Sequence, residues 1–415
     1  MRAAAPVAPQ RRLAAPDLAR GFALFGILLV NLPGFSEPMH EQLMGLKTYD
    51  RPWDQWVYTA LQFAVQGKFY PLFAFLFGFG FVMIMKRAAQ KGGRPVPLMT
   101  RRLLFLLLLG ALHAVLFWWG DILFTYAVAG FVLLLFRRCT PRTLVIWAVA
   151  IACCMTLVQS SVVGLASLSE SVAPDTWAEE MRKVEERYMA EAEASRAAYA
   201  GSYADALRQR LRDLAVVAEN LPFAVLSVLP MFLVGAAWAA ADGWERAERD
   251  RRWLLRLWTA ALAVALPLSV VKYWCLTRMD WLHPSSYDIL YQFCVSFGDP
   301  AAGLFYAFTL VLLGSALPSR AWQRPLVAAG RLSLSLYLMQ TLLCTTIFYG
   351  YGLNQFGKWG PASLAVLALA IYAFQLAAAA LWTRRFAYGP MERLWRAVTY
   401  GRAPTLDVRK ERAES

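Results

Sequence analysis

Charged residues are scarce in this chain, and residues that bind metals are scarcer. Only 17% of the 415 residues are charged, whereas 59% are hydrophobic, which argues against a soluble core. There are three histidines and six cysteines, and they lack the spacing of a metal site. We therefore expect no bound metal. Cys275 and Cys294 flank one predicted outer loop and can pair in an oxidising compartment.

A cleavable signal peptide is also not evident in the sequence. The first apolar stretch follows a basic tail and is longer than the apolar region of a signal peptide. It also lacks a small-x-small cleavage site. We interpret it as the first membrane helix. Residues 1–15, which are rich in Ala, Pro and Arg, are expected to form a disordered tail.

Long apolar runs dominate what is present. A run of about 20 apolar residues crosses the hydrocarbon core of a bilayer, and a single run can do so only as a helix. Residues 101–130 hold two such runs around the turn at 118–121, which predicts a transmembrane hairpin. Residues 53–66 are a weaker candidate, amphipathic or re-entrant. The sequence predicts an all-α, polytopic transmembrane bundle of about ten helices, at residues 18–36, 69–86, 102–119, 121–137, 143–165, 221–241, 254–274, 291–316, 330–352 and 361–383.

The predicted spans form two halves around one hydrophilic insert. The N-terminal half covers residues 16–165 and the C-terminal half covers residues 219–385. The insert, residues 166–218, is Ala-rich and has many opposite charges three or four residues apart, which predicts one or two extramembrane helices. These helices are either a solvated connector or a lid over an outer pocket. Residues 386–415 are expected to form an interfacial amphipathic helix and a tail.

The formal net charge of +14 does not indicate nucleic-acid binding. Lys and Arg gather in alternate loops, and the loops between them are balanced or acidic. This is the positive-inside pattern, and with ten spans it predicts that both termini are cytoplasmic and the insert is outside. The excess of arginine also favours binding of the protein to an anionic lipid surface. Membrane lipids are therefore expected partners, and nucleic acid is not.

Ionisable residues inside membrane spans are costly, so each marks a candidate site. His113 lies eleven residues beyond Arg102, roughly 16 Å along a helix. The usual pKa of imidazole suits a general base, although a buried neutral histidine is the alternative. Asp121, across the turn, either orients the imidazole or caps the next helix. Asn31 and Lys68 are predicted in the same outer half, where Lys68 either meets substrate or reaches the interface.

Two further groups of polar residues occur at predicted helix ends. Asp17 and Arg20 are three residues apart, so they share a helix face and can pair. The alternative is a cytoplasmic mouth where Arg20 meets an anionic phosphate. In the second half, Ser333, Tyr337 and Gln340 also share one face. That face predicts either hydrogen bonds between helices or the lining of a polar channel.

Several segments together resemble one family of bacterial inner-membrane proteins. They are RLAAPDLARGFALFGILLVN, QGKFYPLFAFLFGFGF, RRLLFLLLLGALHAVLFWWGDILFTYAVAG, AGRLSLSLYLMQTLL and YGPMERLWRAVTYG. They resemble the DUF418 family, also called the YeiB family, over nearly the whole chain. That family is similar to the wider group of transmembrane acyltransferases. In those relatives a cytoplasmic acyl-CoA gives its acyl group to a sugar on the far side, with a histidine near the transfer point.

The resemblance implies an acyl-CoA-dependent membrane acyltransferase with a glycan or lipid-linked acceptor. His113 and Asp121 are then the candidate catalytic residues, although His40 in the predicted outer loop is a second candidate for the base. The substrate-binding candidates are Asn31, Lys68 and Gln340. They would supply the hydrogen-bond donors or positive charge near the developing oxyanion. The phosphates of acyl-CoA require cytoplasmic cations, and the candidate residues there are Asp17, Arg20, Arg101, Arg102 and Arg331.

Two other classes of function stay open. A transporter, flippase or lipid-binding protein would use the same buried polar residues as a path, although such paths usually carry several intramembrane acids and this chain has few. The third hypothesis is that the protein is a non-catalytic scaffold. The expected ligands are membrane lipids and a small-molecule or glycan substrate, and the sequence leaves a homodimer open.

Overall fold

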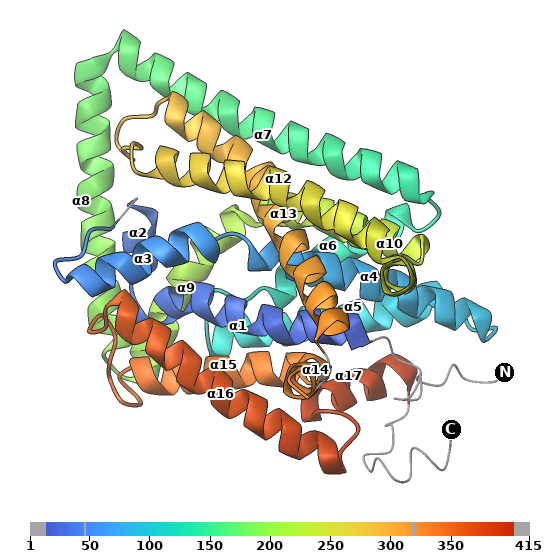
Figure 1. Cartoon of the computed structure of the whole chain (residues 1–415). Coiled ribbons are helices and arrows are strands. Elements are labelled where there is room, and N and C mark those ends of the chain that lie inside the picture. Colours follow the sequence, from blue (N-terminus) through green and yellow to red (C-terminus); the bar gives the residue numbers. More distant parts are fainter. Residues whose placement is uncertain (1–13, 45–46, 318–320, 402–415) are drawn as a thin grey trace.

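Helices make up most of the described structure, and turns and loops connect them (Figure 1). The computed structural model describes residues 14–44, 47–317 and 321–401. Within those ranges there is no β-strand, only an isolated bridge between Asp280 and His283. The α-helices are α1 (Ala14–Ser36), α2 (Met39–Leu43), α3 (Pro52–Ala64), α4 (Phe69–Gln90), α5 (Pro95–Leu116), α6 (Leu123–Leu133), α7 (Pro141–Val172), α8 (Pro174–Tyr199), α9 (Tyr203–Glu219), α10 (Leu221–Ala240), α11 (Gly243–Arg249), α12 (Arg251–Leu276), α13 (Ser286–Ala316), α14 (Gln323–Arg331), α15 (Ser333–Phe348), α16 (Pro361–Arg385) and α17 (Pro390–Tyr400).

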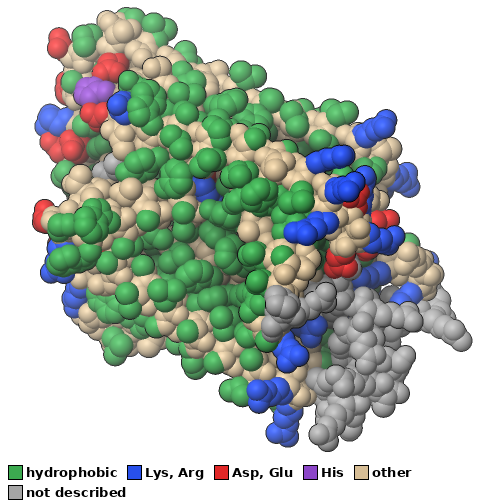
Figure 2. Space-filling model, viewed as in Figure 1, with side chains coloured by type: hydrophobic (Ala, Val, Ile, Leu, Met, Phe, Trp, Pro, Cys, Tyr) green, Lys and Arg blue, Asp and Glu red, His purple; other side chains and the backbone are tan. Residues whose placement is uncertain are grey.

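The prediction of a polytopic helical membrane protein is confirmed. Among the described residues, eight helical segments are long and apolar enough to cross a bilayer, and a ninth is counted if the bent pair α14–α15 is one span. Many of their large apolar side chains point outward, as Ile146, Leu157 and Leu165 do on α7. Figure 2 shows the resulting apolar surface, with charged side chains at its two ends and more Lys and Arg at the right-hand end. Such a surface is stable against lipid rather than water.

The two ends of the bundle carry different elements. One end holds the start of α1, the end of α4 and the short helix α17 (Figure 1). It carries Arg20, Arg102, Arg331 and Arg396, and we call it the arginine-rich end. At the opposite end α8 runs across the ends of the other helices, with α9 nearby (Figure 1). We call this the insert end.

Three predicted spans differ in detail from the observed helices. The segment predicted at 121–137 is the short helix α6 with one 3₁₀ turn ending at Phe136, which is too short to be counted as a span. Helices α3 and α4 make one apolar segment of 39 residues, broken where Gly67 adopts a left-handed conformation with φ +85°. The segment predicted at 330–352 belongs to the pair α14–α15, which is bent by 86°.

Glycines set the closest helix contacts in the bundle. A Cβ on Gly78 of α4 would lie 2.0 Å from the carbonyl oxygen of Phe232 on α10, and one on Gly235 of α10 would lie 2.0 Å from that of Phe75 on α4. Small residues allow membrane helices to approach this closely. At the arginine-rich end, Gly330 of α14 lies against the backbone of α1 in the same way. These contacts fix the positions of α1, α4 and α14 around the site described below.

The hydrophilic insert, predicted at residues 166–218, forms the last turns of α7 followed by α8 and α9. Helix α9 is partly buried rather than solvated along its length. Its Arg210 is fully buried and donates from Nη1 to the carbonyl oxygen of Val115 at 3.0 Å. Tyr203 donates to the carbonyl oxygen of Leu116 at 2.8 Å. The insert therefore covers the end of the α5–α6 hairpin.

The cysteines of this structure are unbonded. Cys275 at the end of α12 and Cys294 in α13 are both fully buried, and both are free thiols. Within the described residues, no cluster of three or more His, Cys, Asp or Glu has the arrangement of a metal site.

Candidate functional site

A cavity of about 280 Å³ lies at the arginine-rich end, between α1, α4, α5, α6, α15 and α17. Its walls are mostly apolar, with Leu24 and Ile27 from α1 and Phe73 and Phe77 from α4. Charged side chains contribute the rest of the lining, and cations outnumber acids among them. They are Asp17, Arg20, Arg87, Lys91, Arg102, Arg331, Glu392 and Arg396.

Asp17 joins two of the lining cations across the α1–α14 contact. Its Oδ1 accepts a hydrogen bond from Arg20 Nη1 at 3.0 Å, so the pair expected from their spacing is present. Its Oδ2 lies 3.6 Å from Arg331 Nε. Arg20 also reaches the carbonyl oxygen of Leu76 on α4 at 3.5 Å. One carboxylate thus holds two guanidinium groups, which leaves this part of the lining positively charged.

Arg102 is held at the cavity by an aromatic residue of α17. Its guanidinium carbon lies 3.3 Å from the ring centroid of Trp395, and Trp395 Nε1 donates to the carbonyl oxygen of Arg102 at 3.0 Å. Stacking on an indole face fixes the plane of the guanidinium and favours its charge. Arg101, predicted for the same role, is exposed and does not line the cavity. Arg101 and Arg102 are consecutive residues of α5 and therefore point to different faces of the helix, so only Arg102 faces the cavity.

The bend between α14 and α15 is stabilised by Glu392 of α17. Its Oε1 accepts from the backbone N–H groups of Leu334 at 2.7 Å and Ser335 at 3.0 Å, and its Oε2 accepts from the Ser335 hydroxyl at 2.5 Å. A helix that starts after a sharp bend has free N–H groups, and a carboxylate satisfies them. Burial nevertheless raises the pKa of Glu392 above its ordinary value.

His113 is the centre of a three-residue hydrogen-bonded chain. Its Nδ1 lies 2.8 Å from Asp121 Oδ1, and its Nε2 lies 2.9 Å from Thr341 Oγ1. Because a carboxylate only accepts, a neutral imidazole in this position carries its proton on Nδ1, and its Nε2 then accepts the hydroxyl proton of Thr341. Asp121 Oδ2 also accepts from the N–H of Phe124 at 2.7 Å. The two roles foreseen for Asp121, orienting the imidazole and capping α6, are therefore both present.

Tyr337 separates this chain from the cavity. Its ring centroid lies 5.4 Å from that of His113, and Tyr337 and Ile122 both belong to the cavity lining. His113 and Thr341 do not line the cavity, and each is almost fully buried. The imidazole therefore lies one side chain behind the cavity lining, against Tyr337.

The other predicted site residues have polar partners of their own. The hydroxyl of Tyr70 donates to Asn31 Oδ1. Lys68 faces Asp299 in α13, with 3.6 Å between Nζ and Oδ1. The amide of Gln340 donates to Gln375 Oε1 at 2.9 Å and to the carbonyl oxygen of Leu24, so it joins α15 to α16 and α1. Of the four residues expected to converge, which are Asn31, Lys68, His113 and Asp121, the last two are in direct contact.

Thr341 was not identified from the sequence. It directly follows Gln340, the last residue of the predicted polar stripe on α15, but it lies on the neighbouring face. A hydroxyl inside an apolar helix carries little information by itself, because it can bond to its own backbone. The contact with His113 joins residues 228 positions apart and therefore depends on the tertiary fold. His40, the second candidate for the base, lies in α2, where its ring packs against Tyr188 of α8.

A second buried polar group lies within the insert, between α8 and α9. Asp213 Oδ2 accepts from the Tyr199 hydroxyl at 2.6 Å, and burial raises the pKa of the carboxyl above its ordinary value. Arg210 donates from Nη1 to Val115, whereas its Nε and Nη2 have no hydrogen-bond partner within the described residues. Val115 is two residues from His113. The insert therefore reaches the hairpin that carries the imidazole.

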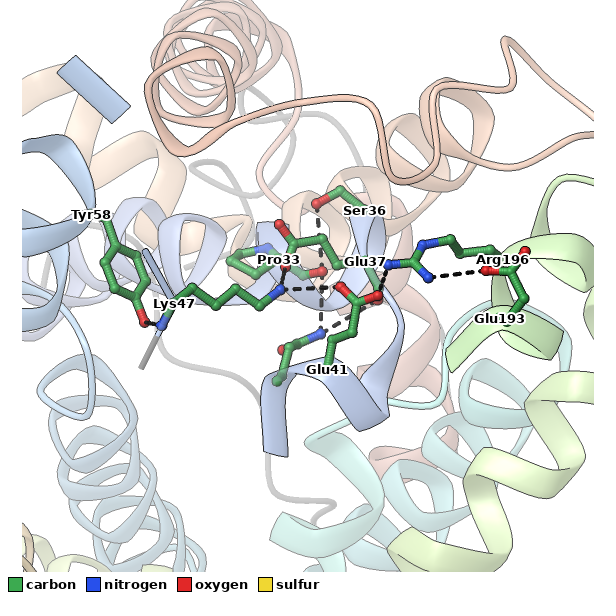
Figure 3. A network of polar contacts seen from close by, with 9 residues as sticks. Pro33, Ser36, Glu37, Glu41, Lys47, Tyr58, Glu193 and Arg196 are labelled. Atoms are coloured by element: carbon green, nitrogen blue, oxygen red, sulfur yellow. Dashed lines mark hydrogen bonds and ion pairs between the residues drawn. The ribbon is translucent and has the colours of Figure 1, made fainter. Parts of the chain in front are cut away.

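A pocket of about 550 Å³ opens beside this buried group, at the insert end. Figure 3 shows Lys47 and Arg196 approaching Glu41 from opposite sides. Lys47 Nζ lies 2.5 Å from Glu37 Oε2 and 3.4 Å from Glu41 Oε2, and Arg196 pairs with Glu41. Trp359 adds an aromatic face to the lining. Paired charges beside an aromatic side chain suit a polar ligand rather than an apolar one.

Comparison with known proteins gives a consistent family assignment. Residues 239–402 match the family model described as "Protein of unknown function (DUF418)". Uncharacterized protein YxaH of Bacillus subtilis (strain 168) is 37% identical over 95% of this chain and 96% of its own length. Uncharacterized protein YeiB of Escherichia coli (strain K12) is 28% identical over 92% of this chain and 95% of its own length. An uncharacterized 39.9 kDa protein of Bacillus acidopullulyticus is 26% identical over 98% of this chain and 99% of its own length.

Proposed function

This chain belongs to the DUF418 family, and on that basis we propose that it is a membrane acyltransferase. It takes an acyl group from an acyl-CoA in the cavity at the arginine-rich end and passes it to a glycan or lipid-linked acceptor at the insert end. The observation that carries this proposal is the chain Thr341–His113–Asp121, which lies behind the cavity-lining residue Tyr337. Its connectivity is that of a nucleophile, a base and an orienting acid.

The lining of the cavity suits the chemistry of the donor. Acyl-CoA has phosphates at one end and a thioester on a less polar arm at the other. Guanidinium groups bind phosphate oxygens through paired hydrogen bonds, and Arg20, Arg102 and Arg331 all line the cavity. Apolar walls lead from them toward Tyr337 and Ile122. A donor lying along this cavity has its thioester beside Tyr337, whose ring moves aside to admit it to Thr341.

The first half of the reaction transfers the acyl group to Thr341. Its Oγ1 attacks the thioester carbonyl carbon while His113 Nε2 takes the hydroxyl proton, and the imidazolium is stabilised by Asp121. The carbon–sulfur bond breaks, and His113 returns the proton to the departing thiolate. The products are free CoA and an ester on Thr341.

The second half of the reaction releases the acyl group to the acceptor. An acceptor hydroxyl or amine attacks the ester carbon and gives its proton to His113 Nε2, which passes that proton back to Thr341 Oγ1 as the ester bond breaks. The acceptor approaches from the insert end, where Arg210 and Tyr203 of α9 contact the hairpin next to His113. In this proposal the arginine-rich end faces the cytoplasm of a bacterial inner membrane, because the acyl-CoA pool is cytoplasmic.

The proposal is tested with purified protein in lipid nanodiscs and radiolabelled acetyl-CoA as the probe. We expect label to become bound covalently to the wild-type protein and to map to the peptide that contains Thr341. Thr341→Ser keeps the hydroxyl and should retain labelling, whereas Thr341→Val keeps the shape and should lose it. Labelling of Thr341→Val equal to wild type would exclude Thr341, and binding of no acyl-CoA by the wild type would exclude the function.

Two broken spans favour a second candidate, a transporter or flippase. Helices α3 and α4 are broken at Gly67, and α14 and α15 are bent by 86°. Interrupted helices in both halves of a membrane protein often mark a transport site. Uptake of a labelled lipid or solute by proteoliposomes, unchanged in Thr341→Val and His113→Gln, would favour this candidate over acyl transfer.

A further inference from the structure

A cluster of three charged side chains lies where α3 and α4 are interrupted. The break falls within the 39-residue apolar segment Pro52–Gln90. Lys68, at the start of α4, faces Lys272 from α12 and Asp299 from α13 at this point. All three residues are buried, with at most 4% of their surface exposed. Ionised side chains in such a place are costly and usually functional.

The two lysines make unequal use of the single carboxylate. Lys272 Nζ lies 2.5 Å from Asp299 Oδ2 and donates to the carbonyl oxygen of Gln66 at 3.2 Å. Its ammonium also lies 5.7 Å from the ring centroid of Tyr291. Lys68 Nζ is 3.6 Å from Asp299 Oδ1, beyond hydrogen-bond length. Within the described residues, neither Lys68 Nζ nor Asp299 Oδ1 has a hydrogen-bond partner.

The charge balance of this cluster is therefore incomplete. One carboxylate neutralises one ammonium, and Lys272 has both the shorter contact and an additional backbone acceptor. In its ionised form Lys68 would carry a positive charge and three N–H donors with no acceptor at hydrogen-bond distance. A buried ammonium without acceptors is strongly unfavourable. Either the amine is neutral, or a ligand supplies the missing acceptor and the missing negative charge.

The backbone at Gly67 lies directly against the charged groups of the cluster. Gly67 has φ +85°, and a Cβ on it would lie 2.1 Å from Asp299 Oδ2 and 2.9 Å from Lys272 Nζ. Only glycine allows the charged groups to approach the backbone so closely. The first turn of α4 follows directly, and the positive end of its dipole adds to the charge of Lys68.

We infer that this break is a binding site for a small monovalent inorganic anion, of which chloride is the abundant example. The anion accepts hydrogen bonds from Lys68 and completes the charge balance of the two lysines and Asp299. It thereby holds the α12–α13 hairpin against the α3–α4 break. This site is separate from the acyl-transfer site, and it stands whether or not that function is correct.

The probe is chloride, exchanged for gluconate at constant ionic strength, and the measurement is the unfolding midpoint of the purified protein. A ligand that binds only the folded state raises that midpoint, and we expect a rise of about 2–4 °C. Lys68→Met leaves the neutral pair Lys272–Asp299 and should abolish the response. Lys183→Met, which removes an exposed lysine of α8, should keep it. No response in the wild type, or an equal one in Lys68→Met, overturns the inference.

A direct measurement keeps the inference testable if Lys68→Met does not fold. Crystals of the wild-type protein soaked in bromide should give an anomalous peak beside the Lys68 ammonium. A map with bromide only at the protein surface would show that the cluster takes no anion. The amine of Lys68 would then be neutral, and the inference would fail.

Discussion

The imidazole of His113 lies 2.8 Å from the carboxylate of Asp121, across the turn that joins α5 to α6. The same carboxylate accepts from the N–H of Phe124 and so caps α6. One side chain therefore fixes both the start of a helix and the tautomer of the histidine. The orientation of the imidazole is as rigid as the hairpin itself.

Asp121→Asn separates these two roles. Asparagine keeps an oxygen that can cap α6, but it no longer favours the imidazolium. We expect the variant to fold like the wild type and to lose about 10²–10⁴-fold in the rate of acyl transfer. His113→Gln should lose a similar factor. The rate of label transfer from acetyl-CoA, with size-exclusion profiles as the folding control, tests both; full activity in either variant would contradict the proposed roles.

Arg20→Ala should weaken the binding of CoA. Arg20 lines the cavity and is held by Asp17, so its loss removes a charge that faces the ligand. We expect at least a tenfold rise in the dissociation constant, equal to about 1.4 kcal/mol. Arg101→Ala is the matched control, because Arg101 is exposed and outside the cavity lining. Titration calorimetry measures both, and equal effects would show that the arginines act only through the overall charge of this end.

The docking of α17 against the start of α15 depends on pH through Glu392. Burial raises its pKa above the ordinary 4.5, so the folded protein binds this proton more tightly than the unfolded chain does. The contribution to stability is present below pH 4.5 and is lost as the pH rises through the raised pKa. Glu392→Gln keeps an acceptor for the N–H groups of α15 and carries no charge. As the pH rises, the unfolding midpoint of the wild type should therefore fall relative to that of Glu392→Gln. A difference between the two midpoints that does not change with pH would contradict this.

Gly78→Ala should destabilise the bundle. The new Cβ would lie 2.0 Å from the carbonyl oxygen of Phe232, so α4 and α10 must move apart, at a cost of about 1–3 kcal/mol. Gly164→Ala on α7 is the control, because nothing lies within 4 Å of its Cβ position. That change should be neutral or stabilise the helix by up to about 1 kcal/mol. Thermal unfolding in detergent distinguishes the two variants, and equal midpoints would contradict the packing argument.

Local patterns account for most of what the sequence predicts correctly. Apolar runs identify the membrane helices, because the bilayer imposes their length. The pairing of Asp17 with Arg20 follows from helix periodicity. The proximity of His113 and Asp121 follows from the shortness of the turn between α5 and α6. In each case the partners are close along the chain, so few alternatives exist.

Contacts between distant segments explain what the sequence does not predict. Thr341 meets His113, and Asp299 meets Lys68, only because separate helices pack together. The partial burial of α9 depends on Arg210 reaching Val115, although the composition of the insert suits solvent. The exclusion of Arg101 from the cavity depends on the rotation of α5, which a hydropathy pattern does not fix. Pair contacts of this kind require the tertiary fold or covariation between positions.

Helix α17 has a consequence for the order in which this protein matures. It is the last described helix, yet Trp395 holds Arg102 of α5, and Glu392 completes the start of α15. During synthesis Arg102 is therefore made long before Trp395, the residue that orients it. The cavity is complete only after α17 has been synthesised and has packed against α5 and α15. A chain that stops short of α17 would carry most of the membrane helices but no finished site.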